Sequence, residues 1–438
     1  MASGSSSDVL MLSVSGMRGT FGGTLTPEVV TRYCGAFASW VREQRGPKKA
    51  GRPRVVVGFD GRAGSETVAV LAGAALQLHG CDVTMLPAPM MTPSVGVVVD
   101  SLGADAGIQA TASHNPQQWC GLKPIVRAPG TRKGAVNASA PDKVRAEQVI
   151  ARYRADDSRP SEWSGVGVLT AEEVEVVADH PAMVLGIVKD LGVLAAIKKA
   201  RLHVALDSVT SSGLWSALLL LDELGVKTSG VNDAAKLADG LFPHTPEPTR
   251  DNLVGLSRFV KKAKGRVDVG FAQDPDGDRL AVVDEQGTYI GEEYTLVLAA
   301  MAMGELGLLK KGQVLAVNLS TSRMIEDVAG WYGCHVVRTA VGEANVVEGM
   351  RANRSPIGGE GNGGVIWPRV TYVRDSLSAM AMVLALMGRT GRPLSALVDG
   401  LPRYAIEKRK VDLASRELAE PALKSLREAY AGERVDVQ

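Results

Sequence analysis

Residues 54–60 read RVVVGFD, and this stretch decides the fold. A mostly apolar, β-branched run that ends at glycine and aspartate is typical of a strand buried in a parallel sheet. Residues 66–79 follow with helical spacing, and Gly80 stands where a helix would end. Further strands are predicted over residues 82–86 and 105–110. Strand, helix and strand in this order predict a mixed or parallel α/β sheet.

The same alternation of strands and helices starts again twice along the chain. Residues 203–207 predict a strand before a helix over 214–224, and residues 267–271 predict a strand that leads into an aspartate-rich loop. A third unit follows, with strands over 313–318 and 335–339 and helices over 322–332 and 343–353. Because open α/β sheets bind ligands beyond the carboxyl ends of their strands, we expect the polar loops at those ends to form the site.

These units divide the chain into domains. The irregular segment 128–164, rich in proline, glycine and charge, ends in a linker after the first unit. The C-terminal part differs: it predicts a strand over 404–411, a charged amphipathic helix from Pro421 to about Tyr430, and the start of a strand over 435–438. The expected domains are residues 1–164, 165–287 and 288–395, followed by a partial C-terminal domain over 396–438.

The composition is that of a globular protein, with 45% hydrophobic and 22% charged residues in a chain of 438, which is too long for one hydrophobic core. The net charge is +1, from 49 Lys and Arg against 48 Asp and Glu, and this balance argues against a general nucleic-acid-binding surface. The longest strongly apolar stretch, around residues 377–387, is too short to span a bilayer, so we expect no membrane partner. The sequence carries no signal for the oligomeric state.

The N-terminal residues and the cysteines indicate the compartment. The chain starts with small polar residues and no basic region, which does not fit a signal peptide. Its four cysteines lie far apart, and none forms a CxxC pair. Scattered free cysteines fit a reducing environment, so we expect a cytoplasmic protein.

Residues 274–279 read DPDGDR and predict a metal site. In a turn made possible by Gly277, the carboxylates of Asp274, Asp276 and Asp278 can converge on one point. Converging carboxylates repel one another unless a cation lies between them, and all-oxygen ligation suits Mg²⁺, Mn²⁺ or Ca²⁺. The alternative is a solvated turn or a weak calcium loop, although an EF-hand would need more ligands and a glutamate about six residues beyond the glycine.

Residues 111–116 read TASHNP and place Ser113 in a polar turn directly after a predicted strand. His114 and Asn115 tolerate unusual backbone angles, and Pro116 fixes the exit from the turn. The stretch does not match the GxSxG elbow of hydrolases. Taken alone, it is better explained as a polar turn at a strand end than as a nucleophile.

Two glycine-containing stretches complete the set of polar loops. Residues 359–364, GEGNGG, offer one carboxylate and one amide, Glu360 and Asn362, which suit the hydroxyl groups of a sugar. They lack the lysine and hydroxyl of a P-loop, and a structural glycine turn is the alternative. Residues 15–19, SGMRG, place Arg18 among glycines, where its guanidinium could bind a phosphate through two hydrogen bonds.

Taken together and in this order, the SGMRG, TASHNP, DPDGDR and GEGNGG stretches resemble the α-D-phosphohexomutase superfamily, of the phosphoglucosamine mutase or phosphomannomutase/phosphoglucomutase type. The resemblance covers nearly the whole chain. It implies an α/β fold of three similar α/β domains with mixed sheets around a central cleft, plus a fourth α+β domain. That expectation agrees with the three units predicted above.

The resemblance also implies roles for individual residues. Ser113 would carry the phosphoryl group and would hold one Mg²⁺ per chain together with Asp274, Asp276 and Asp278. Lys123 corresponds to a general acid/base of the family, and Glu343 falls where relatives have His or Asp. The other implied residues are Arg18 and Arg279 for the transferring phosphoryl group, His114 beside Ser113, Asp60 and Arg62 as a supporting pair, and Glu360, Gly361, Asn362 and Gly363 for the sugar.

The activity implied is that of a phosphosugar mutase. Such an enzyme interconverts a hexose or hexosamine 6-phosphate and its 1-phosphate through a phosphoserine and a bisphosphate, with a sugar bisphosphate as activator. The details of the loops favour glucosamine 6-phosphate. The alternatives are a phosphomannomutase/phosphoglucomutase, a non-catalytic protein that binds sugar phosphates, and a phosphatase-like enzyme in which water takes the phosphoryl group.

The C-terminal part departs from the family pattern. Nothing after Leu401 matches the phosphate-binding loop of the family's fourth domain. That loop grips the substrate phosphate that is not reacting. We therefore expect the partial domain over 396–438 to lack it, which would weaken substrate binding through poorer positioning.

Overall fold

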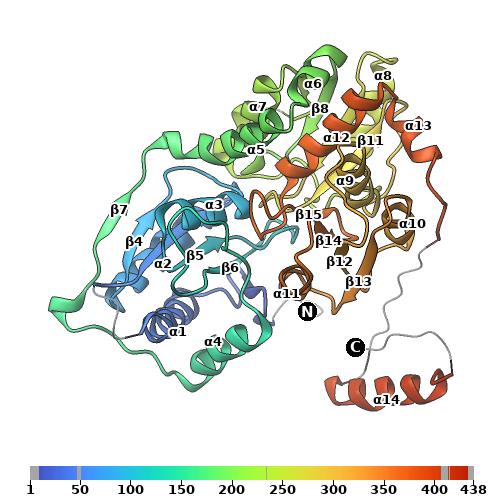
Figure 1. Cartoon of the computed structure of the whole chain (residues 1–438). Helices are drawn as coiled ribbons and strands as arrows, with labels where there is room; N and C mark the ends of the chain where they lie inside the picture. The colour runs from blue at the N-terminus through green and yellow to red at the C-terminus, as the bar shows by residue number, and fades with distance from the viewer. Residues whose placement is uncertain (1–8, 47–50, 233, 406–412, 414, 433–438) are drawn as a thin grey trace, which may run out of the picture.

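The computed structural model describes residues 9–46, 51–232, 234–405, 413 and 415–432, and it contains three α/β units (Figure 1). Each unit is built on one mixed sheet. The alternation of apolar strands and Ala/Leu-rich helices in the sequence is the cause, because each sheet needs helices to cover its apolar faces. The predicted α/β class with three similar domains is therefore confirmed.

The first sheet has the strand order β1-β2-β6-β5-β3-β4-β7. Its centre is parallel, since β3 pairs in parallel with both β4 and β5, whereas β6 runs antiparallel to β5 and β2. Helices α1 and α2 pack together in one core and α3 belongs to a second core. The strands are β1 (Met11–Ser13), β2 (Gly16–Thr20), β3 (Arg54–Phe59), β4 (Asp82–Met85), β5 (Ala106–Ala110), β6 (Trp119–Val126) and β7 (Leu169–Ala171), and the helices α1 (Pro27–Arg45), α2 (Ser65–Leu78), α3 (Thr92–Leu102) and α4 (Lys143–Ala155).

The second sheet has the order β11-β10-β8-β9, and only β11 runs antiparallel to its neighbour. Its strands are β8 (His203–Asp207), β9 (Lys227–Gly230), β10 (Val269–Gln273) and β11 (Leu280–Asp284). Its helices are α5 (Asp179–Asp190), α6 (Leu194–Ala200), α7 (Gly213–Glu223) and α8 (Val254–Lys262). Within the described residues, short 3₁₀ turns occur at Trp163–Gly165, Val174–Ala178, Ala234–Asp239 and Arg416–Leu418.

The third sheet has the order β13-β12-β14-β15, with β15 antiparallel at one edge. Its strands are β12 (Val314–Asn318), β13 (His335–Thr339), β14 (Gly358–Glu360) and β15 (Gly364–Ile366). The helices of this part are α9 (Tyr294–Glu305), α10 (Met324–Trp331), α11 (Glu343–Asn353), α12 (Ser376–Thr390) and α13 (Leu394–Asp399), followed by α14 (Ala419–Ala429).

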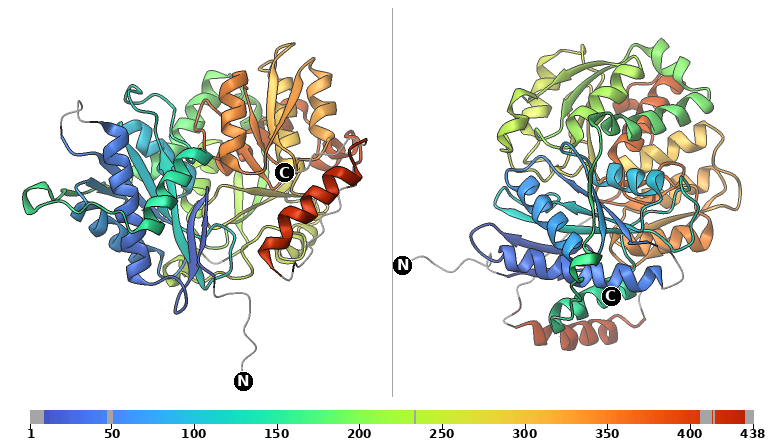
Figure 2. Two further views of the ribbon diagram at one scale, coloured as in Figure 1. Left: turned by 90° about the horizontal axis from the view of Figure 1, so that it is seen from below. Right: turned by 90° about the vertical axis from the view of Figure 1, so that its left-hand side faces the viewer.

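The second and third units share one hydrophobic core. Helix α12 is buried at every position from Ser376 to Met387 and packs against both α9 and α6. A helix that is apolar on all sides must lie inside the protein, and this one lies between two sheets. The apolar stretch around residues 377–387 is thus a core helix that joins two domains (Figure 2).

Most predicted strands and helices of the three units occur within one or two residues of their expected ends, but one local prediction was wrong. Segment 128–164 is not irregular throughout, because it contains α4, whose N-terminus is capped by the Asp142 side chain accepting a hydrogen bond from Arg145 N at 2.8 Å. Among the confirmed strands, β10 has one of the larger shifts, since it begins at Val269, two residues after the predicted start.

The predicted domain boundaries stay a prediction, although one observation bears on the first of them. Strand β7 lies beyond residue 164 and still pairs with β4 in the first sheet. The predicted helix near the C-terminus is α14, which has no buried residue and lies beside the body of the protein (Figure 1). The strands predicted over 404–411 and 435–438 lie almost entirely outside the described residues.

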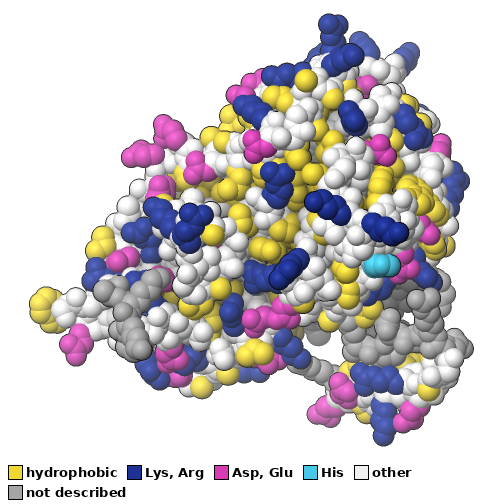
Figure 3. All heavy atoms as spheres, in the orientation of Figure 1, with side chains coloured by type: hydrophobic (Ala, Val, Ile, Leu, Met, Phe, Trp, Pro, Cys, Tyr) yellow, Lys and Arg dark blue, Asp and Glu magenta, His cyan; other side chains and the backbone are white. Residues whose placement is uncertain are grey.

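Positive and negative side chains are interspersed over the face drawn in Figure 3 rather than gathered by sign. Within the described residues, no single helix is long and apolar enough to cross a membrane, and one bent pair, 174–190 with 194–200, passes by length and composition only.

Candidate active site

Polar loops from three domains meet at one place. The loop after β5 carries Ser113, the loop between β10 and β11 carries Asp274, Asp276 and Asp278, and the end of β14 carries Glu360. All five side chains are buried, at 3% exposure or less. The expectation that the polar loops lie beyond strand ends is confirmed for these three, because β5, β10 and β14 each run parallel to a neighbour and end at them.

Ser113 adopts a left-handed backbone conformation, with φ at +51°. Its amide donates to Thr111 Oγ1 at 2.8 Å, and its hydroxyl donates to Asp274 Oδ2 at 3.0 Å. The Oγ atom also lies 3.3 Å from His114 Nδ1. A non-glycine residue pays a conformational penalty in this region, so the surrounding contacts hold the hydroxyl in place.

The predicted supporting pair lies directly behind this loop. Arg62 Nε donates to Asp60 Oδ2 at 2.8 Å, and the Nη2 atom of Arg62 donates to the carbonyl of Ser113. Thr111 Oγ1 donates to the same Asp60 oxygen at 2.6 Å. Because Asp60 and Arg62 are almost completely buried, their hydrogen bonds make a rigid support for the Ser113 turn.

The three aspartates place carboxylate oxygens within 4.8 Å of one another. One oxygen of Asp276, Oδ2, accepts hydrogen bonds from Thr92 Oγ1 at 2.6 Å and Lys123 Nζ at 3.3 Å. The Oδ2 atom of Asp278 accepts from Lys123 Nζ at 2.6 Å. The other oxygen of each, Oδ1, is buried and has no hydrogen-bond partner among the described residues.

Unpartnered buried carboxylate oxygens are costly unless a cation binds them. Burial, and then the neighbouring carboxylates of Asp278 and Asp276, also raise the pKa of Asp274 well above its usual value. The donor set is all oxygen, which a hard divalent cation prefers. The residues present therefore fit a hard divalent cation such as Mg²⁺, which Asp274, Asp276 and Asp278 could hold with Ser113 alongside.

Lys123 lies between the aspartates and Glu343, whose Oε2 is 3.8 Å from Lys123 Nζ. Burial lowers the pKa of Lys123, but the carboxylates of Asp278, Asp276 and Glu343 outweigh it and raise the pKa above its ordinary value. Burial raises the pKa of Glu343. Lys123 is therefore held as an ammonium group, which donates hydrogen bonds to Asp276 and Asp278 with the Glu343 carboxyl close by.

Two predicted arginines flank the aspartates and Ser113. Arg18 Nη1 donates to Asn115 Oδ1 at 2.8 Å, and Arg279 Nε lies 3.9 Å from Asp278 Oδ1. Burial and these two arginines lower the pKa of His114 to about 3, so its imidazole is neutral at physiological pH. The site thus presents fixed positive charge from guanidinium groups rather than from histidine.

Arg374 is a residue of the site that the sequence did not reveal. Its Nη2 atom donates to Asp278 Oδ2 at 2.6 Å, its Nη1 atom donates to Glu360 Oε2, and its Nε atom lies 3.5 Å from Glu343 Oε2. It precedes α12 in the stretch YVRDS, which has no glycine-rich or metal-ligand spacing. Thr92, which binds Asp276, was missed for the same reason.

The loop over residues 359–364, here named the sugar loop after its predicted role, is tightly packed. Glu360 Oε1 accepts from Asn318 Nδ2 at 2.8 Å and from Gly342 N at 3.3 Å, and Glu360 Oε2 lies 3.4 Å from Asn362 Nδ2. Gly363 has φ at +86°, and a Cβ atom there would lie 2.5 Å from the carbonyl oxygen of Leu280. The glycine at 363 is therefore required for the close approach of this loop to β11.

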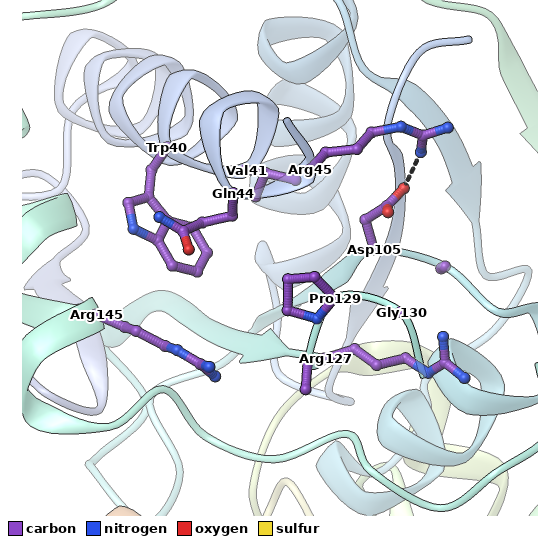
Figure 4. A pocket seen from close by; sticks show the side chains of 11 residues that line it. Trp40, Val41, Gln44, Arg45, Asp105, Arg127, Pro129, Gly130 and Arg145 are labelled. Atoms are coloured by element: carbon purple, nitrogen blue, oxygen red, sulfur yellow. Dashed lines mark hydrogen bonds and ion pairs between the residues drawn. The ribbon is translucent and has the colours of Figure 1, made fainter. Parts of the chain in front are cut away.

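A small hollow elsewhere on the first domain, of about 80 Å³, is lined by three arginines (Figure 4). Each of them is paired with an aspartate: Arg45 with Asp105, Arg127 with Asp100 and Arg145 with Asp142. Because the positive charges are already neutralised, we assign no anion to this hollow.

Three family models match the chain. They are the phosphoglucomutase/phosphomannomutase alpha/beta/alpha domains I, II and III, over residues 11–146, 185–287 and 291–404. A phosphoglucomutase/phosphomannomutase of Thermococcus kodakarensis is 33% identical, over 89% of this chain and 79% of that protein. A phosphoglucosamine/phosphogalactosamine mutase of Sulfurisphaera tokodaii is 29% identical, over 96% and 87%.

The fold is also found among solved structures. That of a phosphoglucomutase/phosphomannomutase family protein from Burkholderia thailandensis superposes with a TM-score of 0.72 at 24% identity, covering 90% of this chain and 81% of the other. Fold, site and matches together define an isomerase that transfers phosphoryl groups. The chain belongs to the α-D-phosphohexomutase superfamily and is a phosphohexomutase.

Proposed function

We propose that this phosphohexomutase works through a phosphoserine at Ser113 and a sugar bisphosphate. The observation that supports the proposal best is the contact of Ser113 Oγ with Asp274, beside two carboxylate oxygens that have no hydrogen-bond partner among the described residues. A bound Mg²⁺ would neutralise charge on the phosphoryl oxygens. Arg18 and Arg279 would neutralise the remaining charge during transfer.

The proposed reaction has two balanced transfers. In the first, a hydroxyl oxygen of a hexose monophosphate bonds to phosphorus while the bond from phosphorus to Ser113 Oγ breaks, and the hydroxyl proton passes to Glu343 as general base. In this first transfer, Lys123 also protonates the departing Ser113 Oγ. The resulting bisphosphate turns over in the site. In the second, Ser113 Oγ bonds to the other phosphorus while the bond from that phosphorus to its sugar oxygen breaks. The Ser113 proton returns to Lys123 and the Glu343 proton passes to the departing sugar oxygen, so both groups are restored. Free sugar bisphosphate acts as activator by phosphorylating Ser113.

For the substrate we propose glucosamine 6-phosphate, converted to glucosamine 1-phosphate. Glu360 and Asn362 offer a carboxylate and an amide at the sugar loop, and these suit an amino group as well as hydroxyl groups. The relative from Sulfurisphaera tokodaii, by its name, acts on amino sugars, and the one from Thermococcus kodakarensis on glucose and mannose phosphates. A phosphomannomutase/phosphoglucomutase is therefore the alternative. We further propose a cytoplasmic location, which suits the four buried free cysteines.

The test is a mutase assay with Mg²⁺, a trace of sugar bisphosphate, and glucosamine, mannose and glucose 6-phosphates in parallel. We expect turnover that is fastest with glucosamine 6-phosphate. Ser113→Ala should lower it by at least about 10³-fold, as removal of a covalent nucleophile does. After incubation with bisphosphate labelled in its phosphates, the label should remain on the wild-type chain and be absent from the variant. Full turnover by Ser113→Ala would rule out the phosphoserine.

A further inference from the structure

We propose that Arg374 is a positioning residue that couples cation binding at the metal loop to ligand binding at the sugar loop. One guanidinium group contacts Asp278 on one side and Glu360 on the other. The inference rests on the proposed function, because it takes the loop of Asp274, Asp276 and Asp278 as the cation site.

The contact with Asp278 fixes the orientation of that carboxylate. Its Oδ2 atom accepts hydrogen bonds from Arg374 Nη2 and from Lys123 Nζ, both at 2.6 Å, whereas its Oδ1 atom has no hydrogen-bond partner among the described residues. With two donors on one oxygen, the carboxylate cannot rotate without breaking both bonds. Hydrogen bonds of this kind set the geometry, and so the affinity, of metal ligands.

The contact with Glu360 ties the same arginine to the sugar loop. Besides Arg374 Nη1, Asn362 Nδ2 donates to Glu360 Oε2, at the longer distance of 3.4 Å. A guanidinium group is planar and rigid, so its two Nη atoms cannot move independently. A ligand hydroxyl that donates a hydrogen bond to Glu360 therefore acts on the hydrogen bond between Arg374 and Asp278.

The backbone of Arg374 is held firmly, so the side chain has a fixed base. Its amide donates to Glu343 Oε1 at 2.9 Å. The next residue, Asp375, caps α12 by accepting hydrogen bonds from Leu377 N and Ser378 N. Lysine could keep the positive charge at position 374, but a single ammonium group cannot reproduce the two divergent contacts. Arg374→Lys therefore separates the effect of the positive charge at position 374 from the effect of the two directed hydrogen bonds.

The experiment measures Mn²⁺ binding to the full chain, by calorimetry and by electron paramagnetic resonance, without substrate or turnover. The proteins are wild type, Arg374→Lys, Glu360→Gln and the double variant. Arg32→Lys is the matched control, because the Arg32 guanidinium also forms hydrogen bonds but lies on α1, remote from the site. Asp276→Asn removes a carboxylate of the proposed cation site, so it shows whether Mn²⁺ binds there.

We expect Arg374→Lys to weaken Mn²⁺ binding about tenfold although the charge is kept. Glu360→Gln should change the Mn²⁺ affinity more when residue 374 is arginine than when it is lysine, and the two effects should differ by about threefold or more. Such a difference shows that the two loops are coupled through Arg374. Wild-type affinity in Arg374→Lys, or equal effects of Glu360→Gln in both backgrounds, would overturn the inference.

Three further outcomes keep the test decisive. If Arg374→Lys does not fold, Glu360→Gln still tests the inference, and a Glu360→Gln protein with wild-type Mn²⁺ affinity overturns it. If Asp276→Asn binds Mn²⁺ as the wild type does, the proposed cation site fails and the inference falls with it. If Asp276→Asn loses Mn²⁺ while Arg374→Lys keeps it, only the coupling is wrong.

Discussion

His180 lies with its Nε2 atom 3.1 Å from Oδ2 of Asp375, a contact between residues 195 positions apart. On the other side of the ring, Nδ1 lies 2.9 Å from Ser94 Oγ. All three side chains are fully buried, in the first turn of α3, the first turn of α5 and the N-cap of α12. A neutral imidazole satisfies both contacts, by accepting from Ser94 and donating to Asp375. The chain of hydrogen bonds thus joins all three domains.

Replacing His180 by alanine should lower the free energy of unfolding by about 2–3 kcal/mol, because it leaves the buried Ser94 Oγ without its partner and removes one hydrogen bond from the buried Asp375 carboxylate. Glutamine, which can place a donor near the position of Nε2, should restore more stability than asparagine. Urea unfolding measures both. His335→Ala, at an exposed position, is the control, and a His180→Ala protein as stable as this control would contradict the prediction.

The stability of the protein should depend on Asp375 in the acid range. Burial raises the pKa of Asp375, but His180 and hydrogen bonds from Ser378 and Leu377 outweigh it and hold the pKa below its usual value. A carboxyl with a lowered folded-state pKa stabilises the fold above its unfolded pKa of about 4, and this contribution is lost as the pH falls through the folded value. The stability difference between wild type and Asp375→Asn should therefore shrink from pH 7 towards pH 3. A difference independent of pH would contradict this.

Thr92→Val should weaken the binding of Mg²⁺ or Mn²⁺ by about tenfold or more, because the variant keeps the shape of the side chain and loses its hydrogen bond to Asp276. Calorimetry on the unphosphorylated protein measures the affinity for the cation. Thr92→Ser should recover most of the affinity. Thr390→Val removes a hydroxyl from the far end of α12 and is the control; equal affinities for Thr92→Val and this control would refute the role.

Gly363→Ala should destabilise the protein and raise the KM for sugar phosphate. The backbone strain alone costs about 1–2 kcal/mol, and the contact of the new Cβ with the Leu280 carbonyl adds to it. Gly307→Ala is a matched control, since Gly307 has φ at +68° and open space around it. Thermal unfolding of both variants separates the backbone strain, which they share, from the Cβ contact with Leu280, which only Gly363→Ala makes. Equal losses would show that the sugar loop tolerates the side chain.

The local pattern of apolar residues was enough to predict the three sheets and the positions of the loops that carry Ser113 and the three aspartates. The run over residues 54–60 is apolar on both faces, so only a strand covered on two sides could contain it. Ser113 and the aspartates of 274–278 follow such strands directly, and the strand ends therefore bring them together. Helix α4 escaped prediction because its surface is mostly charged and only three of its residues are buried.

The roles of Arg374 and Thr92 in the site could not be predicted from the sequence, because each contacts a residue that only the tertiary structure brings close. Arg374 bonds with Asp278, 96 positions away, and Thr92 with Asp276, 184 positions away. Neither residue stands in a glycine-rich loop or among other polar residues of a recognisable spacing. The domains must first pack on one another, and only then does either side chain have a role.

The burial of α12 between two sheets has a consequence for synthesis of the chain. Helix α6 of the second domain is synthesised well before α12, against which it packs in the folded protein. Domains generally fold as units in the order in which they leave the ribosome. Here the second domain must wait, with apolar surface uncovered, until translation has passed Thr390. Nascent chains stopped short of α12 should therefore be the ones that chaperones hold.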